Sequence, residues 1–204
     1  MTKIIITVAE LNRQAFDVLN NDLGPFWDSF FWNFSGKLIW APLYILILYL
    51  IYRKVGLRNM LAAMTIMVLM TVVCDHIGNF FKENYSQLRP SHDPNVGSIV
   101  HRVRNYYGGG LYGTVSSHSS ISFSIAIFSL LTIKRWYYTW PILMWALLIA
   151  YSRIYLGAHY PKDVIFGIAL GSVSGYGFYR SYLVAANRWK WLNNPNKKNK
   201  EIKE

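Results

Sequence analysis

The sequence of 204 residues contains few charges and almost no cysteine. Only 15% of its residues are charged, compared with about 25% in typical soluble domains. The one cysteine, Cys74, lies inside an apolar run, which excludes an intrachain disulfide and a cysteine-based metal site. We also expect no cleavable signal peptide, because residues 1–20 lack a clean apolar core followed by a small-residue cleavage site.

Apolar and basic residues dominate what is present. The chain is 53% hydrophobic and 17% aromatic, with a formal net charge of +11. A nucleic-acid-binding protein can carry such a charge, but its cations usually stud helices and surface loops. Here the cations cluster between long uncharged runs, which is typical of an integral membrane protein. We therefore predict a membrane partner and no nucleic acid.

The apolar segments predict an all-α fold, a polytopic membrane bundle of five to six transmembrane helices. Residues 4–19 have the periodicity of an amphipathic helix at the membrane interface. Residues 25–34 are rich in aromatic rings, which favour the headgroup level, and a sixth helix results if 25–36 inserts. Five candidate spans follow, at residues 38–53, 60–82, 118–133, 136–152 and 163–183.

Basic residues predict how these spans are oriented. They gather in the loops after the first and third spans and in the tail, which the positive-inside rule assigns to the cytoplasm. Residues 83–117 and 153–162 then lie on the other face. The chain divides into an interfacial segment (1–35), a transmembrane domain (36–184) and a basic cytoplasmic tail (185–204).

Three polar clusters fall on that other face, each at the end of an apolar segment. They are Lys82-x6-Arg89-Pro90, Ser116-Ser117-His118 and Ser152-Arg153-x5-His159-x3-Asp163. The cations of these clusters run against the positive-inside rule, so they need another explanation. Binding of a phosphate group provides one, because fixed cations pair well with phosphate oxygens.

The third cluster has the arrangement of a nucleophile at a helix N-terminus. Pro161 suits the first turn of a helix, so His159 precedes a terminus whose N–H groups favour an anion. Asp163, in that first turn, can hold one imidazole nitrogen and leave the other free to attack phosphorus. Arg153 can bind phosphate oxygens with two N–H groups.

The second cluster precedes another apolar helix in the same way. Ser116 or Ser117 can cap that helix, and His118 is placed to protonate a leaving oxygen. Taken singly, each of these residues has a simpler interpretation, such as a cap or a snorkelling side chain. The prediction of a phosphate site therefore depends on their combination.

With these motifs the chain resembles the type 2 phosphatidic acid phosphatase family, membrane enzymes that share their core with vanadium haloperoxidases. The family's pattern is K-x6-R-P, then P-S-G-H, then S-R-x5-H-x3-D. The first and third motifs match at each defining position. In the second motif, Val115 replaces the proline and Ser117 the glycine, which affects the expected pocket size more than the mechanism.

The resemblance implies a role for each matching residue. The residues that bind phosphate would be Lys82, Arg89, Ser116 and Arg153, with Ser117 beside them at the family's glycine position. His159 would be the nucleophile that forms a phosphohistidine, Asp163 would orient it, and His118 would protonate the leaving group. The family requires no metal, so we expect no cofactor.

From this we predict a bacterial inner-membrane phosphatase that hydrolyses a phospholipid or lipid-linked phosphate on the periplasmic side. Its candidate substrates are lipid A, undecaprenyl diphosphate, phosphatidylglycerophosphate and phosphatidic acid. A sugar phosphate would suit the long polar outer loop at 83–117, which favours lipid A. The alternatives are a non-enzymatic lipid-phosphate binder or transporter, which would not need the histidines, and haloperoxidase chemistry, which belongs to soluble proteins.

Two further patterns concern contacts between helices and side chains, and the first leaves alternatives open. Asp75, Asn79 and Lys82 share one helix face, so Asp75 can either hold Lys82 through Asn79 or bond to a neighbouring helix. Glycines at 167, 171 and 175 predict close packing of the last helix against another.

Overall fold

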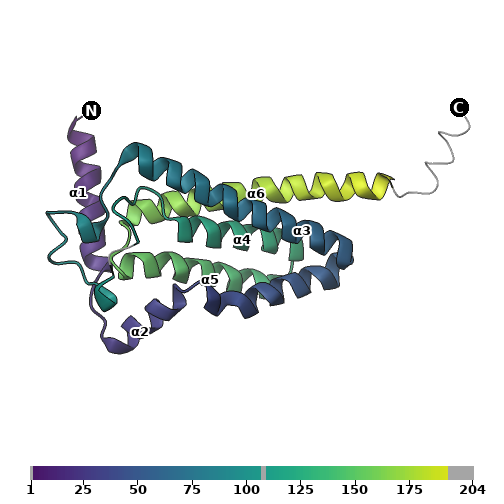
Figure 1. Cartoon of the computed structure of the whole chain (residues 1–204), viewed down its shortest axis with the longest axis horizontal. Helices are drawn as coiled ribbons and strands as arrows, with labels where there is room; N and C mark the ends of the chain where they lie inside the picture. Colours follow the sequence, from purple (N-terminus) through teal and green to yellow (C-terminus); the bar gives the residue numbers. More distant parts are fainter. Residues whose placement is uncertain (1, 107–108, 193–204) are drawn as a thin grey trace, which may run out of the picture.

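The computed structural model describes residues 2–106 and 109–192, which form a helical bundle without β-strands. Figure 1 shows its six α-helices: α1 (Thr2–Leu19), α2 (Pro25–Phe34), α3 (Ala41–Tyr85), α4 (Ser117–Ile133), α5 (Trp136–Tyr155) and α6 (Pro161–Leu192). Three 3-10 turns lie between them: η1 (Leu38–Trp40), η2 (Pro90–His92) and η3 (Val103–Asn105).

The long α3 is folded back on itself. Gly56 has φ 79° and ψ 170°, a conformation that breaks the helix and that L side chains rarely adopt. Figure 1 shows two arms that run in opposite directions on either side of this break. The break lies between the spans predicted at 38–53 and 60–82.

The α4 helix occupies the centre of the bundle. It packs against both α5 and α6 and against α3, and eleven of its 17 residues are buried. Many of those are serines whose hydroxyl groups donate to carbonyls of the preceding turn, as Ser124 does to Ile121 at 2.9 Å. Small side chains of this kind let neighbouring helices approach closely.

Three glycines of α6 provide the closest of these approaches. A Cβ added at Gly167, Gly171 or Gly175 would lie 2.6, 2.3 or 2.7 Å from a backbone carbonyl oxygen of α4 or of its N-cap residue. Such distances are well below van der Waals contact. The structure confirms the prediction that this glycine row packs against a neighbouring helix.

The outside of the bundle is strongly apolar. One helical stretch of the described chain, Leu38–Tyr85, is long and apolar enough to cross a membrane, and only 17% of its most apolar window is buried. Large apolar side chains on α5 and α6 also face outward, including Trp140 (67% exposed) and Val173 (73% exposed). Soluble proteins rarely expose such continuous apolar surface.

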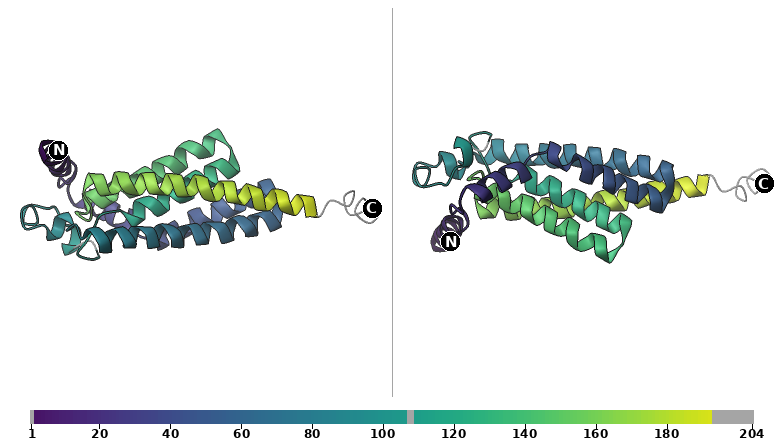
Figure 2. Two further views of the ribbon diagram at one scale, coloured as in Figure 1. Left: turned by 90° about the horizontal axis from the view of Figure 1, so that it is seen from above. Right: turned by 90° about the horizontal axis from the view of Figure 1, so that it is seen from below.

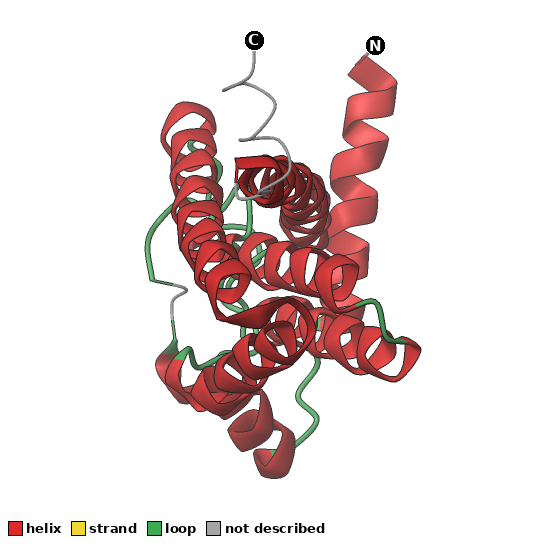
Figure 3. Ribbon diagram, turned by 90° about the vertical axis from the view of Figure 1, so that its right-hand side faces the viewer, coloured by secondary structure: helices red, strands yellow, loops and turns green. Residues whose placement is uncertain are grey.

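The first two helices lie across or beside the bundle rather than along it. Figures 2 and 3 show α1, at the end marked N, standing apart from the lengthwise helices. It is anchored by Phe16, which is 2% exposed and packs edge-on against Tyr160. The ten residues of α2 extend about 15 Å, only half of a bilayer core, so α2 alone does not form the sixth span considered for 25–36.

The loops divide between the two ends of the bundle. The α3 break and the α4–α5 turn meet at one end, where Lys54 donates to the carbonyl of Ile133. Figure 1 places the last turns of α6 toward the same end and the segment between α3 and α4 at the other. The predicted tail is described only to Leu192, and 193–204 lie outside the described residues.

Candidate active site

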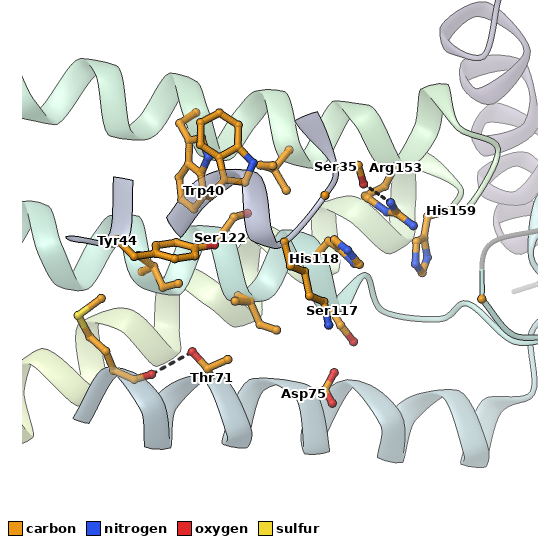
Figure 4. A pocket seen from close by; sticks show the side chains of 18 of the residues that line it. Ser35, Trp40, Tyr44, Thr71, Asp75, Ser117, His118, Ser122, Arg153 and His159 are labelled. Atoms are coloured by element: carbon orange, nitrogen blue, oxygen red, sulfur yellow. Dashed lines mark hydrogen bonds between the residues drawn. The ribbon is translucent and has the colours of Figure 1, made fainter. Parts of the chain in front are cut away.

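A cavity of about 570 Å³ opens at the end of the bundle where the three polar clusters meet. Residues from each cluster line it: Lys82, Arg89, Ser117, His118, Arg153 and His159. Figure 4 shows His118, Arg153 and His159 grouped at one end of this space. The structure thus brings together residues separated by up to 77 positions in the sequence, from 82 to 159.

His159 lies in the turn before α6, as the proline at 161 predicted. Its Nε2 lies 3.1 Å from Nη1 of Arg89. A guanidinium group can only donate, so Nε2 accepts and carries no proton. The proton is then on Nδ1, which lies 3.2 Å from the carbonyl oxygen of Gly113 and 3.5 Å from Oδ2 of Asp163. The unprotonated nitrogen therefore faces the cationic side of the cavity.

Asp163 lies behind His159 and is fully buried. Its Oδ2 accepts a hydrogen bond from the backbone N–H of Tyr160 at 3.2 Å, and its backbone carbonyl accepts from the N–H of Ser116 at 3.0 Å. Asp163 thereby ties the start of α6 to the start of α4. The carbonyl of Gly113, which the sequence did not single out, is the closer partner of the imidazole.

Arg89 is held by the segments that precede α4 and α6. Its Nε donates to the carbonyl of Tyr112 at 3.0 Å and its Nη1 to that of Ala158 at 3.0 Å. At Gly113 an added Cβ would lie 2.7 Å from Cγ of Arg89, so only glycine fits beside this side chain. A buried arginine fixed in this way presents its remaining N–H groups without further rearrangement.

Arg153 lies in the last turn of α5 and is 3% exposed. Its Nη1 donates to Oγ of Ser35 and its Nη2 to the hydroxyl of Tyr106 at 2.9 Å, while its Nε has no partner in the described chain. Figure 4 shows the Ser35 contact as a dashed line. Neither Ser35 nor Tyr106 belongs to a recognisable motif, because both reach Arg153 only through tertiary packing.

Lys82 connects the cavity to a polar row on α3. Its Nζ donates to Oγ of Ser117 at 2.8 Å and to Oδ1 of Asn79 at 3.1 Å. Asn79 in turn donates to Oδ2 of Asp75 at 3.3 Å. The structure confirms the alternative in which Asp75 holds Lys82 through Asn79. Gly78 leaves room for Ser117, since a Cβ there would lie 3.1 Å from the serine hydroxyl.

The two serines of the second cluster are placed differently. Ser116 caps α4, is fully buried and accepts from N–H and Oγ of Ser119 at 3.4 and 2.9 Å. It is not among the residues that line the cavity, whereas Ser117 and His118 are. Of the two serines expected at the phosphate site, Ser117 is therefore the one in the cavity, where its hydroxyl accepts from Lys82.

Burial and positive charge act together on His159. Its pKa lies well below the usual 6.5, first because the imidazole is completely buried and then because Arg89, Arg153 and Lys82 repel a further positive charge. The imidazole is consequently neutral at neutral pH, which a nitrogen nucleophile requires.

Such a site defines a class of protein. Three cations beside an unprotonated imidazole, at the end of an apolar helical bundle, have the composition of a phosphoryl-transfer centre for membrane lipids. The chain belongs to the PAP2 superfamily, whose model matches residues 56–186.

Known proteins agree with this membership. The chain is 35% identical over 183 residues to "Lipid A 4'-phosphatase" of Porphyromonas gingivalis, covering 89% of this chain and 77% of that one. It is 29% identical over 141 residues to "Undecaprenyl-diphosphatase" of Sulfolobus acidocaldarius, covering 69% and 62%. The crystal structure of LpxE from Aquifex aeolicus superposes with a TM-score of 0.62 at 26% identity, covering 83% and 95%. The protein is a phosphoric ester hydrolase of membrane lipid metabolism.

Proposed function

We propose that this protein removes a phosphate group from lipid A through a covalent phosphohistidine at His159. The observation that carries the proposal is the unprotonated Nε2 of His159, 3.1 Å from Arg89 and in one cavity with Lys82 and Arg153. A phosphate bound by these cations places its phosphorus in front of the nucleophile.

In the first step the Nε2 lone pair forms a bond to phosphorus and the bond from phosphorus to the lipid oxygen breaks. The negative charge of the bound phosphate favours protonation of His118, which lines the same cavity and donates this proton to the leaving oxygen. Arg89, Arg153 and Lys82 stabilise the charge that develops on the phosphate oxygens. Gly113 and Asp163 keep the Nδ1 proton in place.

In the second step water attacks the phosphohistidine. The water gives a proton to His118, the bond between nitrogen and phosphorus breaks, and inorganic phosphate leaves. The groups thereby return to their starting protonation states. Each role in these steps falls to a residue of this chain, and no metal takes part in the proposed scheme.

The choice of lipid A as substrate is supported by the 35% identity to the protein named "Lipid A 4'-phosphatase". Gly109, Tyr106 and Lys37 also line the cavity, so its lining extends beyond the residues expected to bind the phosphate. Lys37 is an exposed additional cation suited to a large polar headgroup. Undecaprenyl diphosphate, phosphatidylglycerophosphate and phosphatidic acid are the competing substrates.

We further propose five membrane spans: the two arms of α3, then α4, α5 and α6. All five run along the bundle in Figure 1, and the basic loops lie at the end opposite the cavity. The positive-inside rule then places the cavity on the periplasmic face of an inner membrane. In this arrangement residues 1–35 lie at the interface, 36–184 form the catalytic domain, and 185–204 form the cytoplasmic tail.

A phosphate-release screen of purified protein against these four lipids tests the proposal. We expect the highest kcat/KM for lipid A, with mass spectrometry showing the loss of one phosphate. A higher kcat/KM for undecaprenyl diphosphate would reject the substrate assignment. Binding of all four lipids without phosphate release would instead support the non-enzymatic alternative.

A further inference from the structure

Beyond the phosphate site, the cavity continues along α3, α4 and α5 between apolar side chains, some of which are also exposed at the outer surface. Leu48, Met64 and Val68 line this inner part, as expected for a region that holds hydrocarbon. Methionines there can adapt to chains of different shape. Polar side chains also interrupt this apolar wall. One of them, Thr71, donates to the carbonyl of Met67. Three others, which the phosphate chemistry does not use, are together called the polar belt: Tyr44, Ser122 and Trp145.

The polar belt lies one helix turn deeper than the proposed acid. Ser122 follows His118 by four residues on α4, a rise of about 6 Å. In Figure 4 the labelled Tyr44 and Ser122 lie along the same stretch of the cavity, on the side of His118 that faces away from His159. Tyr44 comes from the first arm of α3 and Trp145 from α5, so three helices contribute to the belt.

The groups of the polar belt have unused hydrogen-bonding capacity. The hydroxyl of Tyr44 has no partner within the described chain, and Ser122 donates to the carbonyl of Ser119 at 3.2 Å but keeps its own lone pairs. Trp145 is 7% exposed, packs edge-on against Tyr44 at 6.3 Å, and its buried Nε1–H has no partner in the described residues. Buried polar groups are nearly always satisfied, so this group calls for an explanation.

We propose that the polar belt binds the carbonyl or hydroxyl group of an acyl chain attached next to the phosphate-bearing carbon. This inference rests on the proposed function, because it assumes that the phosphate lies between His118 and His159. An ester-linked chain carries its carbonyl about one helix turn from the leaving oxygen, where Tyr44 can donate to it. A polyprenyl diphosphate has only hydrocarbon at that depth and would leave the belt unpaired, which costs binding energy. The belt thus selects acylated phosphate monoesters, whether their backbone is a sugar or glycerol.

The test is the double variant Tyr44→Phe/Ser122→Ala, which removes only two oxygen atoms. Its matched control is Tyr52→Phe/Ser124→Ala, which changes the same residue types on the same helices outside the cavity. Two substrate pairs are compared: diacylglycerol phosphate with its dialkyl ether, and lipid A with the form from which ester-linked chains have been removed. The readout is the ratio of kcat/KM within each pair.

We expect the wild type and the control to prefer the ester-bearing member by about tenfold, the value of one or two neutral hydrogen bonds. In the double variant this ratio falls to near one. The pair with the larger change identifies the sugar or the glycerol as the source of the acyl group. If the double variant still hydrolyses the ether substrate, it is folded. If the double variant does not fold, the single variant Tyr44→Phe is tested in its place.

An ester preference that persists in the double variant, or that is absent from the wild type, would overturn the inference. In both cases phosphate is still released, so the proposed function stands. A wild type that releases no phosphate from any of these lipids would defeat the proposed function, and the inference with it.

Discussion

At the scale of single residues, His159 is distinguished by contacts that leave one nitrogen available. Arg89 donates an N–H to Nε2, which therefore carries no proton of its own, whereas Gly113 and Asp163 both lie on the Nδ1 side. A phosphate entering the cavity would displace the Arg89 contact and meet the same lone pair. The arginine then turns from a partner of the histidine into a partner of the substrate.

His159→Ala is therefore expected to lower phosphate release by several powers of ten, because the attacking atom is removed. Phosphate release from lipid A in detergent measures the effect. His76→Ala serves as the control, since His76 lies on the exposed side of α3 and bonds only to the carbonyl of Val72 among described residues. Wild-type turnover in the His159 variant would exclude this residue as the nucleophile.

Residue spacing predicted the cations and histidines of the cavity, because the motifs place each of them at a helix end. It could not predict Gly113, Ser35 or Tyr106, which contact His159 and Arg153 from segments distant in the sequence. It placed both Ser116 and Ser117 at the phosphate site, whereas Ser117 is the one of the two that lines the cavity. Which of two adjacent serines caps a helix depends on backbone angles that spacing does not specify.

At the scale of helices, the apolar runs predicted which helices exist more accurately than they predicted where each helix begins and ends. The span predicted at 163–183 continues in α6 to Leu192, since charged residues end a membrane segment without ending a helix. The spans predicted at 38–53 and 60–82 are arms of one helix broken at Gly56. The glycine row on α6 was predicted correctly, because a period of four places its members on one helix face.

Gly171→Ala tests that packing at its tightest point. The new methyl group would lie 2.3 Å from the carbonyl oxygen of Ser120, so the two helices must separate. We expect thermal unfolding in detergent at a temperature several degrees lower, corresponding to about 1–3 kcal/mol for an overpacked contact. Gly177→Ala is the matched control, because nothing lies within 4 Å of its added Cβ. Equal stability of the two variants would contradict the close approach of α4 and α6.

At the scale of the whole molecule, the basic loops and the cavity lie at opposite ends, which predicts sidedness. Cys74 is first replaced by Ala, and single cysteines are introduced at the exposed positions Ser98 and Arg135. Ser98→Cys should react with an impermeant maleimide in intact spheroplasts, whereas Arg135→Cys should react only after lysis. The reverse pattern would place the active site in the cytoplasm.

The cavity as a whole predicts activity without a divalent metal, because its cations already neutralise the phosphate. Turnover should be unchanged in excess EDTA. The carboxylate and imidazole groups that come closest to metal-binding spacing in the described chain, Asp22, Asp28 and His101, do not line the cavity. Loss of turnover that Mg²⁺ restores would contradict the proposed mechanism.

The covalent step is the centre of this account, and rapid quenching of a single turnover tests it most directly. Lipid A labelled with ³²P at the phosphate is mixed with excess enzyme and quenched in alkali after milliseconds to seconds, because a phosphohistidine survives alkali and is lost in acid. The account predicts protein-bound label that appears before free phosphate, decays as phosphate is released, and is absent from His159→Ala. Release of labelled phosphate by the wild type with no labelled protein at any time would contradict it.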